Sequence, residues 1–206
     1  VMMLLAEAEV LASLDEQRQA LASAQEAISI SRQVVDPSLE CYALYKVCFD
    51  AHLQLRQEDE ALDVLMEAWE IRRGLRSSGD ESSRRVAAKA AETVARACQL
   101  SAPGVAEEAA RDAVSLYQAL GDRRGEAAAL SLTAQLHLAR GAYREAVRPA
   151  KESLALCQAL GSRQGLVAAT SSLVKAQSRS DDLLEALSSA QDGLAWFQSR
   201  SDARGE

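Results

Sequence analysis

Small and apolar side chains recur along the chain at intervals of three and four residues, the periodicity of a helix that buries one face. The clearest signal is a triplet of mostly small residues, spaced four and then three, which occurs as Ala20/Ala24/Ala27, Ala61/Leu65/Ala68, Ala106/Ala110/Ala113, Ala146/Ala150/Ser153 and Ala186/Ala190/Gly193. This spacing puts each triplet on one stripe of its helix, where a neighbouring helix can come close. The first members stand 41, 45, 40 and 40 residues apart, so the pattern predicts five similar units.

A second motif repeats with the same step. Residues 120–126 read LGDRRGE, residues 160–166 read LGSRQGL, and residues 200–206 read RSDARGE. Any alanine-rich helix contains small triplets by chance, but their agreement with an independent motif favours a true repeat. We therefore expect a single solenoid domain over residues 1–206, with repeats at about 1–35, 36–79, 80–121, 122–161 and 162–201, and with 202–206 beginning a sixth.

Helix-starting and helix-ending residues divide each repeat into two helices. Asp36 and Asp122 are placed to cap helix N-termini, while Gly121 and Gly141 follow helix ends, where a left-handed residue is favoured. Pro149 lies inside a predicted helix, where proline kinks the helix or loosens its first turn. Repeats two and five lack the glycine between their helices, so we expect loops of different shape there. The ten predicted helices span 1–13, 15–34, 38–55, 58–76, 81–99, 104–119, 123–139, 142–159, 163–179 and 181–198.

Composition supports an all-α fold and narrows the class of partner. The chain has 40 alanines, 4% aromatic residues and only 3 prolines, so residues that favour helices dominate. Its net charge of −7, from 23 basic and 30 acidic residues, gives no electrostatic basis for binding nucleic acid. No apolar stretch approaches the roughly 20 residues needed to span a bilayer, and we expect a soluble protein without a transmembrane segment.

Residues able to do chemistry are few and scattered. The two histidines, His52 and His137, belong to different repeats. The four cysteines form no CxxC pair, so buried free thiols are favoured over a disulfide or a metal site. The sequence contains no metalloprotease, phosphate-loop or dinucleotide motif. We expect a protein that is not an enzyme and has no cofactor, in a reducing compartment such as the cytoplasm; an organelle reached through a removed targeting segment is the alternative.

The repeat unit resembles the tetratricopeptide (TPR) family. The resemblance rests on helix pairs of about 40 residues, on the LGDRRGEA opening at residues 120–127, and on GAYREA at residues 141–146, which starts a second helix. The longer-repeat subtype of G-protein-signalling modulators, kinesin light chains and bacterial regulator sensor arrays is the most similar, and the resemblance covers essentially the whole chain. It implies a right-handed α-solenoid of about five helix-turn-helix repeats, in which the first helix of each repeat lines a concave groove.

Placing the first helices in register with the small triplets predicts which side chains enter that groove. The candidate partner-binding residues are Lys46, Asp50, Lys89, Thr93, Arg96, Ser131, Gln135, Ser171, Lys175 and Arg179. Three of the chain's four lysines are in this set, whereas the second helices carry acidic runs such as residues 58–60. A mildly basic groove favours an acidic or C-terminal peptide; a solvated polar face without a role is the alternative. The chain contains no asparagine. It therefore lacks residues of the carboxylate clamp by which chaperone-tail binders of this family hold their ligand, and we do not expect the same ligand here.

Two functions remain open. The first is a non-catalytic scaffold or peripheral subunit of a larger assembly, which binds a partner segment in the groove or docks by its edges. The second is a peptide-sensing regulatory module of a multidomain regulator. Because a repeat array needs polar terminal caps, and the sequence begins inside a helix and ends in a sixth repeat, we expect a slice of a longer array or ends covered by other subunits.

Overall fold

The computed structural model describes residues 1–77 and 79–202, with the side chains of 1–77 and 79–198. All regular structure within these residues is helical, and the chain divides into two compact units, Val1–Leu116 and Tyr117–Glu206. The predicted sixth repeat falls largely on residues 203–206, outside the described residues, and the division into repeats stays a prediction.

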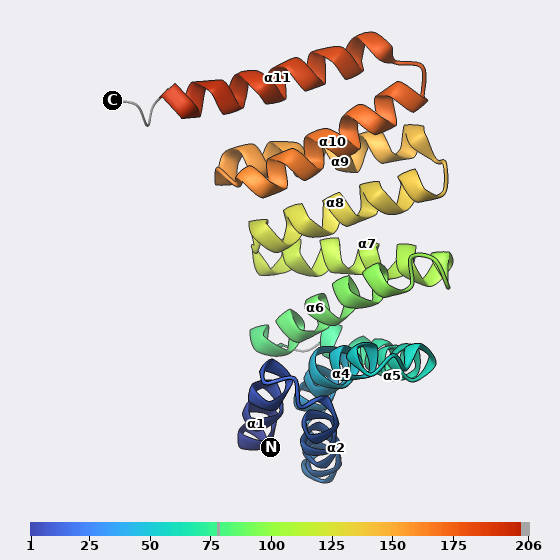
Figure 1. The fold of residues 1–206 in the computed structure, drawn as a ribbon, viewed down its shortest axis with the longest axis vertical. Helices are drawn as coiled ribbons and strands as arrows, with labels where there is room; N and C mark the ends of the chain where they lie inside the picture. The colour runs from blue at the N-terminus through green and yellow to red at the C-terminus, as the bar shows by residue number, and fades with distance from the viewer. Residues whose placement is uncertain (78, 203–206) are drawn as a thin grey trace. The chain divides into compact units, whose positions relative to one another are not determined.

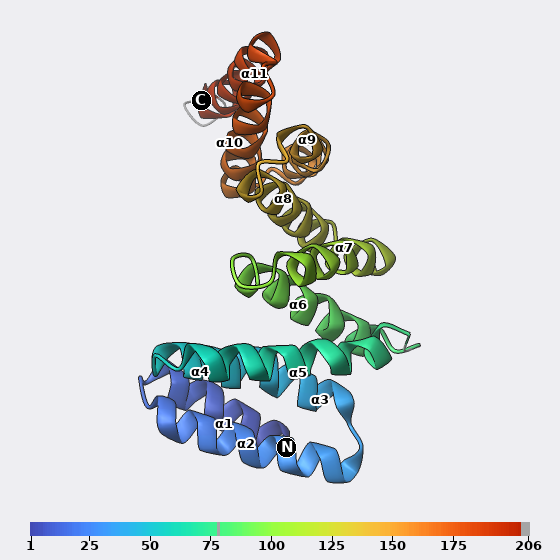
Figure 2. The same cartoon turned by 90° about the vertical axis from the view of Figure 1, so that its right-hand side faces the viewer.

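The first unit contains three antiparallel helix pairs (Figures 1 and 2). Helix α1 (Met2–Ser13) packs on α2 (Gln17–Val34), and both contact the next long helix. That helix is continuous through α3 (Pro37–Tyr42), η1 (Ala43–Cys48) and α4 (Phe49–Gln54), and it packs on α5 (Glu58–Arg76). Helix α6 (Glu81–Ala97) then packs on α5 and on α3, and α7 (Pro103–Leu120) follows it.

Segment η1 is a π-helix, which the sequence analysis did not predict. Its six residues interrupt a helix that was expected to run regularly from 38 to 55. Single π-helical turns inside α-helices are rare and occur frequently at functional sites. Nothing in the helical periodicity distinguishes this turn, because five of its six residues are buried and the helix continues on both sides.

The second unit contains α8 (Arg123–Ala139), α9 (Tyr143–Leu160), α10 (Arg163–Arg179) and α11 (Leu183–Asp202), each packed on the next (Figure 1). Helix α9 continues through Pro149, which is buried. The described residues thus form ten helical segments, if α3, η1 and α4 are counted as one, and their bounds agree with the ten predicted helices within about three residues at most ends. The all-α fold with ten helices is confirmed.

The helix caps follow the sequence prediction, but the predicted loop differences are wrong. Asp36 and Asp122 accept hydrogen bonds from backbone N–H groups of the helices that follow. Gly141 is left-handed, with φ +75°, between α8 and α9. In repeats two and five, Arg56 (φ +62°) and Asp181 (φ +67°) adopt the same left-handed conformation without glycine. The backbone of the turn is therefore kept, because the packing of the two helices outweighs the cost of a side chain there.

The second glycine of the repeated LGxxxG motif has a packing role. A Cβ atom on Gly125 would lie 2.3 Å from Cδ1 of Tyr117, whose ring is fully buried. Forty residues later, a Cβ atom on Gly165 would lie 2.5 Å from Sγ of the buried Cys157. In both repeats the glycine lets the start of a first helix contact the side chain that precedes the loop, which explains why the motif recurs at a step of 40.

A candidate binding groove in the first unit

A cavity of about 710 Å³ opens along the first unit between the continuous helix α3–η1–α4 and helix α6. We call it the first-unit groove. Its lining residues are Tyr42, Tyr45, Lys46, Phe49, Asp50, Leu53, Lys89, Glu92, Thr93, Arg96 and Ala97. The π-helical turn contributes Tyr45 and Lys46 to it.

The groove brings together five of the ten side chains predicted from the sequence. These are Lys46, Asp50, Lys89, Thr93 and Arg96. They come from first helices of two successive predicted repeats, so the register deduced from the small triplets placed them on facing elements. The hydroxyl of Thr93 donates to the Lys89 carbonyl of its own helix, 3.0 Å away.

The other five predicted residues lie in the second unit and do not line the first-unit groove. Ser131 and Gln135 are on α8, and Ser171, Lys175 and Arg179 are on α10, which packs against α8. Of these five, Arg179 borders a smaller cavity of about 350 Å³ at the loop between α8 and α9. The prediction of one continuous basic groove through both sets is not tested, and it stays a prediction.

One wall of the first-unit groove is largely aromatic. Tyr42 and Tyr45 contact edge to face, with ring centroids 5.6 Å apart, and Phe49 follows one turn later. Tyr45 and Phe49 are almost fully buried, whereas Leu53 at the end of the wall is 42% exposed. The accessible part of this wall, at Tyr42 and Leu53, offers apolar contact area to a ligand.

The charged side chains of the groove are paired with one another. Lys46 Nζ lies 3.4 Å from a carboxylate oxygen of Asp50. The Glu92 carboxylate pairs with Lys89 Nζ at 2.9 Å and with an Arg96 guanidinium nitrogen at 2.8 Å. The side chain of Glu92 is only 10% exposed, whereas the three cations are half or more exposed. The lining therefore holds three cations and two anions, and it is only mildly basic.

Glu92 and the aromatic wall are the groove residues that the sequence analysis missed. Glu92 stands three residues after Lys89 and four before Arg96, which is the spacing of ion pairs on a helix surface. That spacing was a usable signal. The aromatic residues gave none, because buried aromatic residues between helices are equally expected in any helical repeat.

A second cavity of about 420 Å³ borders α1 and shares Tyr42, Lys46 and Asp50 with the first-unit groove. On this side the hydroxyl of Tyr42 donates to Glu9 Oε1, 2.5 Å away. Burial and this hydrogen bond raise the pKa of Tyr42 to about 12. The phenol therefore stays a neutral donor at physiological pH, and it ties α1 to the aromatic wall.

The four thiols are free and buried, as predicted. Burial raises the pKa of Cys41 and Cys48 to about 12, and it also raises the pKa of Cys98 and Cys157. Each is held as a thiol, the form that is a poor nucleophile and metal ligand. Among the described residues there is no group of three His, Cys, Asp or Glu side chains that could hold a metal ion. None of the described helices is long and apolar enough to cross a bilayer.

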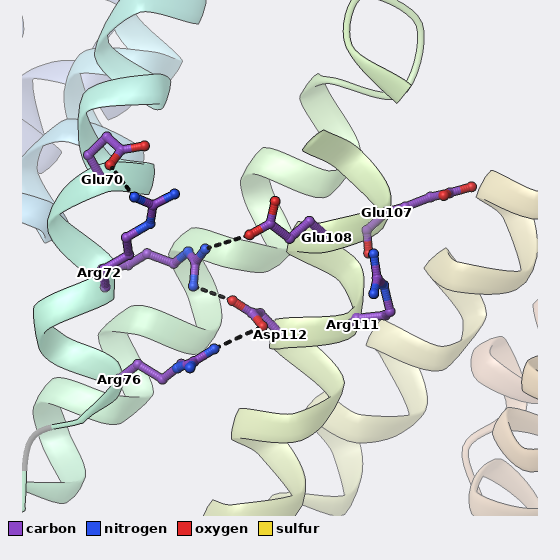
Figure 3. A network of polar contacts seen from close by, with 8 residues as sticks. Glu70, Arg72, Arg76, Glu107, Glu108, Arg111 and Asp112 are labelled. Carbon is purple, nitrogen blue, oxygen red and sulfur yellow. Dashed lines mark hydrogen bonds and ion pairs between the residues drawn. The ribbon is translucent and has the colours of Figure 1, made fainter. Parts of the chain in front are cut away.

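An ion-pair network in the first unit connects α5 to α7 (Figure 3). Arg72 is 1% exposed; its guanidinium lies 3.2 Å from the centroid of the Trp69 ring and donates to Asp112. Arg76 pairs with the other carboxylate oxygen of Asp112 at 3.3 Å, and Glu108 lies 4.0 Å from Arg72. Burial lowers the pKa of Arg72 despite these acids. The network holds together the second helices of two successive predicted repeats.

Comparison with known proteins supports the fold. No family model and no curated protein matches the sequence. Among solved structures, BtubC from P. vanneervenii matches with a TM-score of 0.76 and 18% identity over 94% of this chain and 78% of its own. The nearly identical TPR-like repeats of a Podospora anserina protein, described as a putative kinesin light chain, give a TM-score of 0.72 and 16% identity over 98% of this chain and 96% of their own.

A third structure is part of a larger protein. The STAND signal-transduction ATPase of Pyrococcus horikoshii, which has a tetratricopeptide repeat sensor, matches 98% of this chain over 30% of its own length, with a TM-score of 0.69 and 16% identity. Identities this low establish the fold and nothing about the ligand. The chain has the TPR-like helical-repeat fold, and that prediction from the sequence is confirmed.

Proposed function

We propose that the protein is a non-catalytic interaction module, a scaffold or peripheral subunit, that binds an acidic partner segment in the first-unit groove. The observation that carries the proposal is the groove itself, a cavity of about 710 Å³ in which Lys89 and Arg96 of α6 lie opposite the aromatic wall, and Lys46 lies beside that wall. In this proposal the chain is one array of five repeats in a reducing compartment, in keeping with its four buried free thiols.

The lining specifies the chemistry of the segment. Lys46 and Lys89 come from facing helices, and their side chains, which pair with Asp50 and Glu92, are about half exposed. A carboxylate of the partner can share these cations, while an apolar side chain contacts Tyr42 and Leu53. We therefore expect a segment that carries one or two carboxylates next to a large apolar residue, rather than a long acidic run.

The experiment that tests this function is selection from a displayed library of random twelve-residue peptides. The wild-type protein is used for selection, and the Lys46→Glu/Lys89→Glu protein is used for counter-selection. We expect the enriched peptides to be rich in Asp and Glu and to contain a large apolar residue. Enriched peptides with the charge composition of the starting library, or equal recovery on the charge-reversed protein, would contradict the proposal.

Glu92 limits the affinity of the groove for acidic segments. Its carboxylate occupies Lys89 and Arg96, so a partner carboxylate must compete with it. We expect Glu92→Gln to bind an enriched acidic peptide roughly threefold to tenfold more tightly, by the strength of a partly exposed ion pair. Isothermal titration calorimetry measures the change.

The matched control for this prediction is Glu81→Gln. Glu81 also forms an ion pair on α6, with Arg85 at 2.7 Å, but neither residue lines the groove. The control should leave the affinity within about twofold of wild type. Unchanged or weaker binding by Glu92→Gln, with the fold intact by circular dichroism, would show that Glu92 does not compete with the ligand.

A sensor role is the second candidate, and the match to a STAND protein with a TPR sensor favours it. A sensor must change conformation when it binds its ligand. Hydrogen exchange with and without an enriched peptide separates the two roles. Protection confined to the groove supports a scaffold, whereas altered exchange in the second unit supports a sensor.

A further inference from the structure

The first-unit groove continues past the aromatic wall as far as helix α1. The cavity of about 420 Å³ that borders α1 shares Tyr42, Lys46 and Asp50 with the groove, so the two cavities meet along the continuous helix α3–η1–α4. Helix α1 contributes Glu9 to this smaller cavity. We call the smaller cavity the α1 end of the groove, and the part lined by α6 its α6 end.

The lining at the α6 end is net basic. Lys89 and Arg96 both pair with the one carboxylate of Glu92. Lys46 and Asp50, which line both ends, pair with each other, so their charges cancel. The lining side chains of α6 therefore leave one positive charge in excess at this end.

The lining at the α1 end is net acidic. Glu9 is the charged residue that α1 contributes, and its carboxylate accepts a hydrogen bond from the hydroxyl of Tyr42, a neutral donor. Among the side chains that the structure describes, no cation forms an ion pair with Glu9. One negative charge is therefore left in excess here, because the Lys46–Asp50 pair adds none. The two ends of the groove carry opposite charge, and Tyr42 lines both.

The spacing of the helices sets the distance between the two ends. Helix α1 contacts η1 and helix α6 contacts α3, so the two flank the continuous helix (Figures 1 and 2). Packed helices have axes roughly 8–10 Å apart, and two such steps separate the ends by roughly 16–20 Å. An extended segment rises about 3.3 Å per residue, so about five or six residues span that distance.

We propose that the segment bound in the first-unit groove is polarised, with its carboxylates at the α6 end and a basic side chain about five or six residues away at the α1 end, near Glu9 and Asp50. This inference rests on the proposed function, and it adds the direction in which the segment crosses the three helices. The reversed segment is disfavoured, because its carboxylates would then face Glu9 and its basic side chain would face Lys89 and Arg96.

The test compares binding of an enriched peptide to the wild-type protein and to Glu9→Gln. Glutamine keeps an acceptor for the Tyr42 hydroxyl, so the variant removes the charge and retains the hydrogen bond. We expect the enriched peptides to share a Lys or Arg about five or six residues from an Asp or Glu. By fluorescence anisotropy, Glu9→Gln should weaken binding about threefold to tenfold. With a peptide whose basic residue is replaced by Gln, the same variant should change the affinity less than about twofold.

The matched control is Glu7→Gln, which makes the same change on α1 at an exposed residue outside both cavities. It should leave the affinity within about twofold of wild type. Binding that depends on Lys89 but not on Glu9 would overturn the polarised segment and leave the proposed function standing. Equal weakening by Glu9→Gln and Glu7→Gln, or equal weakening for both peptides, would also overturn it. Failure of any peptide to be enriched would overturn both proposals.

Discussion

Replacing Asp112 by alanine should destabilise the first unit by about 3 kcal/mol, because the buried guanidinium of Arg72 then loses its main acidic partner. The remaining acid, Glu108, is 4.0 Å away and more than half exposed. An uncompensated charge in this position costs more than the ion pair contributes. Urea denaturation followed by far-UV circular dichroism, with hydrogen exchange in α5 and α7 to localise the loss, measures the effect.

The double variant Arg72→Met/Asp112→Leu is the matched control. It removes both charges and keeps an apolar side chain at each site, so its cost should be about 1 kcal/mol or less. An equal loss in the single and the double variants would show that packing between α5 and α7, and not an unpaired charge, determines stability at this site. Arg72→Met alone should cost less than Asp112→Ala, because Asp112 keeps Arg76 as a partner.

Gly125→Ala should destabilise the second unit by about 1–3 kcal/mol. The added Cβ atom would lie within 2.7 Å of three atoms of the Tyr117 ring, which is fully buried and cannot move aside without displacing its neighbours. Thermal or urea denaturation monitored by circular dichroism measures the change in stability.

Two further variants separate this clash from the helix propensity of alanine. Gly104→Ala places a Cβ atom where nothing lies within 4 Å, so it should be neutral or slightly stabilising. In the Tyr117→Leu background the smaller side chain leaves space, and Gly125→Ala should cost less there than in the wild type. Equal costs in both backgrounds would contradict the role assigned to this glycine.

The fold could be predicted because the same sequence pattern recurs in successive repeats. The small triplets and the LGxxxG motif are independent signals with one period, and the structure gives both a physical basis in helix packing. The turn at Arg56 was mispredicted. One left-handed residue without glycine costs little free energy compared with the packing of the two helices, and the local sequence does not reveal that packing. The π-helical turn at η1 left no trace in the apolar periodicity, because five of its six residues are buried and the helix continues on both sides.

The groove could be predicted only in part. The helical register was sufficient to predict that Lys46 and Lys89 lie on helices that face each other across the groove. It could not show that Glu92 is buried between two cations, because burial depends on the neighbouring helix. The unexpected acid narrows the expected ligand from an acidic or C-terminal peptide to a segment that joins a few carboxylates to an apolar residue.

The binding of a peptide enriched by the wild-type protein to single charge-reversal variants tests the proposed groove most directly. By fluorescence anisotropy, Lys46→Glu and Lys89→Glu should each weaken binding about tenfold or more, and the affinity should fall as salt rises. Lys175→Glu makes the same change on α10 in the second unit, outside the first-unit groove, and should leave the affinity within about twofold. Equal affinities for all four proteins would contradict the assignment of the groove as the binding site.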